Sequence, residues 1–177
     1  NILKAMGRKG RKKDIMEIID KLRANIKDIS IRTTMMVGFP GETESDFDEL
    51  KGFIKYAKFE NMGVFKYSRE EGTAAFKMKD QVPEELKSIR KGELMLLQQK
   101  IVESAGKSKI GKVYKVIVEG KKGNLWYGRN YEMAPDIDGL VYIKCESELE
   151  RGTMIDVKII RSIQYDLLGV VCDELGE

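Results

Sequence analysis

The chain has 177 residues, 42% hydrophobic and 34% charged, with a net charge of +3, proportions that are typical of one or two globular domains. No apolar run is long enough for a membrane-spanning helix and no signal peptide opens the chain, so we expect a cytoplasmic protein that makes no membrane contact. The sequence lacks histidine, which excludes the commonest general base and zinc ligand. Its two cysteines, Cys145 and Cys172, lie far apart among apolar residues and predict reduced core thiols.

The first segment is basic. Six Lys or Arg residues precede the first acidic residue, Asp14 (Lys4, Arg8, Lys9, Arg11, Lys12 and Lys13). Such a run can attract nucleic acid or an anionic cofactor group, but more often it is a solvated face. Apolar residues then recur at helical spacing and predict an amphipathic helix from about Asp14 to Asn25 that buries Ile15, Ile18, Ile19 and Leu22.

A strand, a turn and a helix are predicted next. Residues 29–37 alternate and are rich in β-branched and apolar types, which favours a strand that is covered on both faces. Gly38 allows close approach to the backbone, and Pro40 with Gly41 makes a turn. Thr43 and Asp46 have the spacing of a helix cap. A strand, a glycine turn and a capped helix can form a ligand shelf, although an isolated turn of this kind is more often only a connection.

The following segments complete a β-α-β unit. Apolar residues of segment 47–57 predict an amphipathic helix, and residues 62–67 predict a short strand. Parallel strands present ligands at their carboxyl ends, so Val37 and Gly38 should face the same site as Phe65 and Tyr67. A helix of roughly two dozen residues should begin near Pro83 and reach Ser104, and its expected apolar face comprises Leu86, Ile89, Leu94, Leu97 and Ile101.

Short alternating runs begin after Gly106. Five strands are predicted at residues 112–118, 124–128, 139–144, 154–160 and 164–172, separated by Gly, Asn and Asp. This pattern indicates a small antiparallel barrel between about Lys107 and Leu175.

Several of these segments resemble the radical S-adenosylmethionine (SAM) methylthiotransferases. The matching stretches are residues 2–8, 32–43, 67–75 and 94–99, followed by a barrel similar to the TRAM domain. Residues 126–139 resemble the signature of the type that modifies a ribosomal protein, although Asn130 stands where Ser or Thr is expected. The implied fold is an α/β partial TIM-like barrel, the C-terminal half of a radical SAM barrel, at residues 1–106, followed by a small all-β antiparallel, OB-like TRAM barrel at residues 107–177.

The resemblance also implies a reaction. The complete enzymes cleave SAM reductively to a 5′-deoxyadenosyl radical, remove a hydrogen from the β-carbon of an aspartate and transfer a methylthio group. They hold two iron–sulfur clusters on cysteine trios, and this chain has only two separated cysteines. The cluster ligands therefore lie outside this chain, which should be inactive alone and should contain no catalytic or metal-binding residue. The N-terminal remainder of the same enzyme is an expected partner.

The resemblance implies binding roles for nine residues. Val37, Gly38, Phe65 and Tyr67 should contact the cofactor, whereas Arg8, Arg69, Glu71, Tyr127 and Arg129 should lie near the substrate. Each role has a structural alternative. Arg69 with Glu71 can be a surface ion pair, Phe65 can fill the barrel, and Tyr127 can pack across strands instead of stacking on bases.

Charge distinguishes the expected partners. Residues 107–177 carry 11 basic and 12 acidic side chains, a net charge of −1, whereas residues 1–106 carry 21 and 17, a net charge of +4. A module that binds RNA phosphates should have a surplus of Lys and Arg, so we expect a basic small-subunit ribosomal protein as the partner and consider RNA less favoured. Two alternatives remain: a tRNA methylthiotransferase of the same family and a non-catalytic TRAM-containing binding protein.

Overall fold

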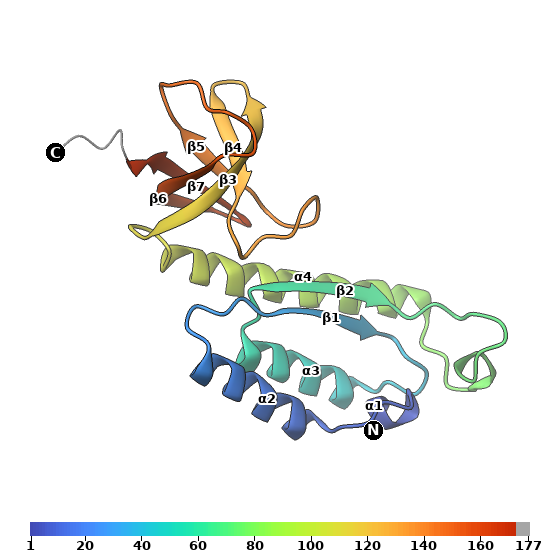
Figure 1. The fold of residues 1–177 in the computed structure, drawn as a ribbon. Coiled ribbons are helices and arrows are strands. Elements are labelled where there is room, and N and C mark those ends of the chain that lie inside the picture. Colours follow the sequence, from blue (N-terminus) through green and yellow to red (C-terminus); the bar gives the residue numbers. More distant parts are fainter. Residues whose placement is uncertain (173–177) are drawn as a thin grey trace. The chain divides into compact units, whose positions relative to one another are not determined.

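The chain forms two compact units that divide after Gln98, and each is described separately (Figure 1). The structure is a computed structural model that describes residues 1–172. The predicted end of the barrel near Leu175 lies outside the described residues. Among residues 1–172, no helix is both long and apolar enough to cross a membrane.

The first unit contains a parallel β-α-β crossover. Its elements are α1 (Ile2–Ala5), α2 (Lys12–Asn25), β1 (Arg32–Val37), α3 (Glu44–Ala57), β2 (Asn61–Lys66), a 3₁₀ turn (Ala75–Lys77) and the first part of α4 (Glu84–Lys107). Strands β1 and β2 pair in parallel, with Met35 opposite Val64 and Met36 opposite Phe65. The predicted crossover is therefore confirmed, and the carboxyl ends of both strands lie at the same edge.

Helix α3 begins where the sequence predicts a cap. Thr43 Oγ1 accepts a hydrogen bond from the amide of Asp46 at 3.2 Å, and the Asp46 carboxylate accepts one from the amide of Thr43 at 3.0 Å. Each side chain satisfies an amide that the first helical turn leaves unpaired. The predicted apolar face is also confirmed, because Phe47, Phe53 and Ile54 are buried.

Only one face of the two strands is covered. Val37, Met62 and Val64 are buried, whereas Met36 is 41% exposed and Phe65 is 59% exposed. The expectation that the first strand is covered on both faces is wrong for the described residues. Successive side chains of a strand point to opposite faces, so Val37, Met62 and Val64 share the covered face, and the register partners Met36 and Phe65 lie on the other. The other face of the two strands is therefore open, and we refer to it as the open face.

Two predicted helix faces also differ from the structure. On α2, Ile19 is buried but Ile18 is 57% exposed, so the predicted apolar stripe is only partly in the core. On α4, Leu94 is fully buried but Ile89 is 51% exposed. The buried face of α4 also carries three polar or charged side chains (Lys87, Arg90 and Gln98). Burial there depends on polar partners from other segments, which local hydrophobic spacing does not reveal.

The second unit is a closed five-stranded barrel. Its strands are β3 (Val113–Lys122), β4 (Leu125–Arg129), β5 (Val141–Lys144), β6 (Met154–Ile163) and β7 (Asp166–Val171), in the order β3-β4-β5-β7-β6 around the ring. All five predicted strands are present. The prediction of an antiparallel barrel is confirmed for four of the five strand pairs, whereas β5 and β7 pair in parallel. A closed ring with an odd number of strands cannot alternate in direction throughout, so at least one neighbouring pair must be parallel.

The barrel is filled by alternate residues of its strands. The buried cluster consists of Val116, Val118, Trp126, Val141, Ile143, Val157, Ile159, Leu167 and Val171. Cys145 packs against this cluster, and both Cys145 and Cys172 are half-buried and take part in no disulfide among the described residues. Neither thiol is fully buried, so the prediction of core positions holds only in part, and the reduced state stays a prediction.

Candidate cofactor and substrate site

The carboxyl ends of β1 and β2 bring together the four residues that were predicted to bind a cofactor. The amide of Tyr67 donates to the carbonyl oxygen of Val37 at 2.9 Å, which continues the parallel pairing one residue beyond β2. The side chain of Val37 is fully buried, whereas that of Phe65 lies on the open face. Of these two strand-end side chains, Phe65 is therefore the accessible one.

Gly38 occupies a turn that another segment of the chain approaches closely. Its φ is +76°, a conformation that favours glycine, and its amide donates to Glu42 Oε1 at 3.0 Å. The space that a Cβ would occupy is filled by the aliphatic stem of Lys87. The sequence predicts a close approach at Gly38, and in this structure the approaching group is a side chain of α4.

Glu42 and Arg90 form a buried ion pair beside this turn. The two side chains are each 4% exposed, and Arg90 Nη1 lies 2.7 Å from Glu42 Oε1. Arg90 Nη2 also donates to Glu44 Oε2 at 3.0 Å. Burial lowers the pKa of the Arg90 guanidinium, but its hydrogen bonds to Glu44 and Glu42 outweigh burial and raise that pKa. Arg90 therefore carries a permanent positive charge that holds Glu42 against the amide of Gly38.

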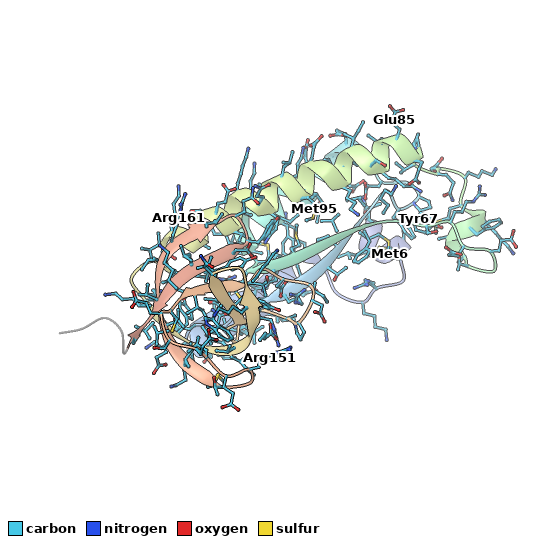
Figure 2. The ribbon with its side chains drawn as sticks, turned by 90° about the horizontal axis from the view of Figure 1, so that it is seen from above. Met6, Tyr67, Glu85, Met95, Arg151 and Arg161 are labelled. Atoms are coloured by element: carbon cyan, nitrogen blue, oxygen red, sulfur yellow. The ribbon has the colours of Figure 1, made fainter. Side chains whose placement is uncertain are left out.

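Tyr67 is a buried residue just after the end of β2, and Figure 2 labels it. Its ring makes an edge contact with Phe39 at 5.3 Å between centroids, and Lys87 Nζ lies 5.2 Å from the ring centre. Lys87 Nζ also donates to the carbonyl oxygen of Tyr67 at 2.9 Å. The hydroxyl of Tyr67 is buried and has no hydrogen-bond partner among the described residues. A buried hydroxyl of this kind is a candidate for pairing with a ligand.

Arg8, Arg69 and Glu71 were predicted to lie near the substrate. No contact among the described residues joins these three side chains. Arg8 and Glu71 are exposed. Arg69 Nε donates to the carbonyl oxygen of Phe76 at 3.0 Å, and its guanidinium lies 4.5 Å from the centre of the Phe76 ring. Arg69 thus stabilises its own loop, and the alternative of a surface ion pair with Glu71 is wrong among the described contacts.

Tyr127 and Arg129 lie on β4 of the barrel, and both have internal partners. Tyr127 packs over Gly120 on β3, which agrees with the cross-strand alternative. Arg129 Nε donates to Glu119 Oε1 at 2.7 Å, and this hydrogen bond raises the pKa of Arg129. The arginine side chain is 19% exposed, so it presents little free charge to a partner.

The sequence reasoning missed Lys87, Arg90 and Glu42. The available signal was the weak amphipathicity of residues 84–107, where the charged residues Lys87 and Arg90 fall at helical spacing with the buried Leu94. A helix whose inward positions include charges must pair those charges inside the protein. No group of three or more potential ligands that could hold a metal ion occurs among residues 1–172.

The chain matches known proteins along its whole length. The Radical SAM superfamily model matches residues 1–54, and the TRAM domain model matches residues 110–172. The protein called ribosomal protein uS12 methylthiotransferase RimO from Clostridium kluyveri is 68% identical over 177 residues, which are 100% of this chain and 40% of that protein. The proteins of the same name from Clostridium botulinum (strain Langeland) and Clostridium tetani are each 51% identical, over 100% and 98% of this chain.

These relatives are longer than the sequence described here. The chain spans 40% of the Clostridium kluyveri and Clostridium botulinum proteins and 39% of the Clostridium tetani protein. Within that span, the resemblance to the radical SAM methylthiotransferases of the ribosomal-protein type is confirmed.

Proposed function

Since the resemblance to the radical SAM methylthiotransferases holds over the whole chain, we propose that this chain supplies part of an enzyme that methylthiolates the β-carbon of an aspartate in a small-subunit ribosomal protein. The observation that carries this proposal is the 68% identity to a uS12 methylthiotransferase over all 177 residues. At this similarity the two chains share a fold, and the residues around the strand-end site are expected to correspond.

We infer that residues 1–106 form the C-terminal half of a TIM-like radical SAM barrel and residues 107–177 a TRAM domain. The parallel β1-α3-β2 unit supports the first assignment, because TIM-like barrels are built from such units. The open face of β1 and β2 corresponds to the interior of a complete barrel, so the N-terminal remainder of the enzyme would cover it. The closed five-stranded ring supports the second assignment.

The strand-end residues fit a cofactor such as SAM in part. Met36 and Phe65 are register neighbours and place exposed apolar surface on the open face, which suits a flat heterocycle. The buried hydroxyl of Tyr67 offers an unused hydrogen-bonding group. Val37 and Gly38 would contribute backbone, since the Val37 side chain is buried and Lys87 covers Gly38. When bound, SAM together with a reduced iron–sulfur cluster supplies the radical chemistry, and the cluster ligands lie outside this chain.

The remaining predicted residues would orient the substrate. Arg8 and Glu71 are exposed and available, whereas Arg69 would act by shaping its loop through Phe76. On the barrel, Tyr127 and Arg129 would contribute surface beside their internal partners. The charge of −1 over residues 107–177 favours a basic ribosomal protein over RNA as the bound partner, which would place the reaction in the cytoplasm. A tRNA substrate is the alternative.

A chimeric enzyme tests this proposal. The matching 40% of the Clostridium kluyveri protein is replaced by this chain, and the iron–sulfur clusters are reconstituted. The product with uS12 is examined by mass spectrometry for an aspartate in which a methylthio group has replaced a hydrogen. The unmodified Clostridium kluyveri protein is the positive control. This chain alone is the negative control, because it lacks the cluster cysteines.

We expect the chimera to methylthiolate uS12. We expect no methylthio group on tRNA that is incubated with the chimera in the same way. Modification of tRNA without modification of uS12 would establish the alternative substrate. A folded chimera with intact clusters that cleaves SAM but modifies neither substrate would contradict the proposal.

A further inference from the structure

The buried face of α4 meets the turn at the end of β1 with charged side chains. Lys87 is 6% exposed and Arg90 is 3% exposed, although lysine and arginine are among the residues least often buried. They lie three residues apart, so both face the same side of the helix. Each reaches a backbone segment that follows a strand of the first unit.

Arg90 acts on the turn through Glu42. Its guanidinium binds the Glu42 side chain, and the same carboxylate oxygen accepts the amide hydrogen of Gly38. Arg90 Nη1 also donates to the carbonyl oxygen of Glu42 at 3.3 Å. Its guanidinium lies 5.2 Å from the centre of the ring of Phe47, which is 1% exposed. The position of the Gly38 amide is thus fixed by a charge-assisted chain of contacts that begins on α4.

Lys87 acts on both strand ends. Its aliphatic stem fills the space beside the α-carbon of Gly38, and its ammonium donates to the carbonyl oxygen of Tyr67. Glu84, one turn earlier on α4, lies 3.3 Å from the same ammonium and balances its charge. One side chain therefore joins the residue after β1 to the residue after β2.

We propose that Lys87 and Arg90 are positioning residues that hold the ends of β1 and β2 in one preformed arrangement. Neither residue needs to touch a ligand for this role. They fix Gly38 and Tyr67, and they tie the geometry of the strand-end site to α4. The description of these ends as a cofactor site rests on the proposed function, whereas the positioning itself is a property of this chain.

Amide hydrogen exchange measured by NMR on the 177-residue chain tests the proposal without cofactor or substrate. The reporters are the amides of Gly38 and Tyr67, and amides elsewhere in α3 and β2 report general opening. Lys87→Met keeps an unbranched stem but removes the ammonium. Lys91→Met is the matched control, because it makes the same change at an exposed position of α4. Leu94→Ala opens a fully buried position of α4 that makes no hydrogen bond to the turn.

Arg90 requires three variants, since removal of one partner from a buried ion pair can prevent folding. Arg90→Met tests the charge directly. The double variant Glu42→Gln/Arg90→Met removes both charges and leaves a side-chain carbonyl that can still accept from Gly38. Arg90→Lys keeps one charge but cannot reach Glu42 and Glu44 in the two-pronged geometry of arginine.

We expect Lys87→Met to accelerate exchange at Tyr67, and Arg90→Met to accelerate exchange at Gly38, each about tenfold relative to amides elsewhere in the unit. The double variant should recover part of the protection at Gly38, and Arg90→Lys should lie between wild type and Arg90→Met. Lys91→Met should leave exchange unchanged, and Leu94→Ala should accelerate exchange at all amides of the unit in parallel.

If Lys87→Met and the Arg90 variants also accelerate exchange at all amides in parallel, or at none, the positioning role is refuted. The result of the chimeric assay would not be affected.

Discussion

The hydroxyl of Tyr127 on β4 lies over the α-carbon of Gly120 on β3, and the two residues are register partners across the antiparallel pair. A Cβ at position 120 would stand 2.7 Å from the tyrosine oxygen and 2.9 Å from Cζ. Gly120 also follows an irregularity in the register of β3 with β4. The glycine therefore makes room for the aromatic side chain, and the position of Tyr127 on the barrel depends on it.

Replacement of Gly120 by alanine should destabilise the barrel. We expect Gly120→Ala to lower the free energy of unfolding by about 1–3 kcal/mol, because the added methyl group forces the Tyr127 ring away. Trp126 is the single tryptophan and lies in the barrel core, so its fluorescence during urea unfolding reports this unit. In the Tyr127→Ala background, Gly120→Ala should lower the free energy of unfolding much less. Equal costs in both backgrounds would mean that the tyrosine does not require the glycine.

The cap of α3 should make the first unit sensitive to acid. The pKa of Asp46 lies below its usual value. The largest cause is the hydrogen bond with the Thr43 side chain, and the next is the hydrogen bond from the Thr43 backbone amide. A carboxylate with a lowered folded-state pKa contributes stability above its unfolded pKa of about 3.9 and loses that contribution as the pH falls through the folded pKa. Asp46→Asn should therefore cost about 1 kcal/mol near pH 6 and progressively less below about pH 4.

Urea unfolding is measured at several pH values, and the NMR signals of residues in the first unit report the fraction of folded protein. Asp48→Asn is the control, since Asp48 lies on the same helix but pairs with Lys51 on the surface. If the difference in the free energy of unfolding between wild type and Asp46→Asn does not change with pH, the assignment of the carboxylate to the cap is contradicted.

The loop between β4 and β5 should steer a basic partner toward the barrel. Asp136 is exposed and has a φ of +59°, a conformation that asparagine tolerates, so Asp136→Asn removes charge without backbone strain. Asp138 is unsuitable for this test, because its carboxylate accepts from the amide of Ala134 at 2.6 Å and holds the loop. We expect Asp136→Asn to slow association with uS12 by roughly two- to fivefold at low salt, with little change in dissociation.

Stopped-flow binding at several salt concentrations measures this effect. Glu150→Gln removes the same charge from an exposed position in the loop between β5 and β6 and should have a smaller effect. A tRNA ligand would respond in the opposite direction, because loss of a negative charge strengthens phosphate binding and steepens its salt dependence. An unchanged association rate for Asp136→Asn would place the contact surface elsewhere on the barrel.

Local signals account for the parts of the fold that the sequence predicts well. Thr43 and Asp46 cap α3 from within four residues, and the alternation of residues 112–118 and 154–160 marks strands whose inward side chains form part of the barrel core. The rule that parallel strands present ligands at their carboxyl ends predicted one site for Phe65 and Tyr67 with Gly38, and the family resemblance implied a cofactor there. Both kinds of information are present in contiguous stretches of sequence.

The inward face of α4 could not be predicted in the same way. Arg90 is buried because Glu42 and Glu44, more than 40 positions earlier, supply its hydrogen bonds. Gln98 donates to the carbonyl oxygen of Phe59, 39 positions away. Hydrophobic periodicity places charged residues outside, so partners this distant in the sequence overturn its prediction.

The parallel pairing of β5 with β7 bears on the order in which the barrel assembles. The β3–β4 and β6–β7 pairs are hairpins of neighbouring segments, whereas β5 pairs with β7 across the intervening strand β6 in the sequence. At the start of this seam the amide of Leu140 donates to the Asp166 carboxylate at 2.7 Å, across 26 positions of sequence. Contacts between distant segments form late, because the chain must first lose the entropy of closing a long loop. The parallel seam is therefore expected to form after the two hairpins, and substitutions at this seam should slow folding less than they accelerate unfolding.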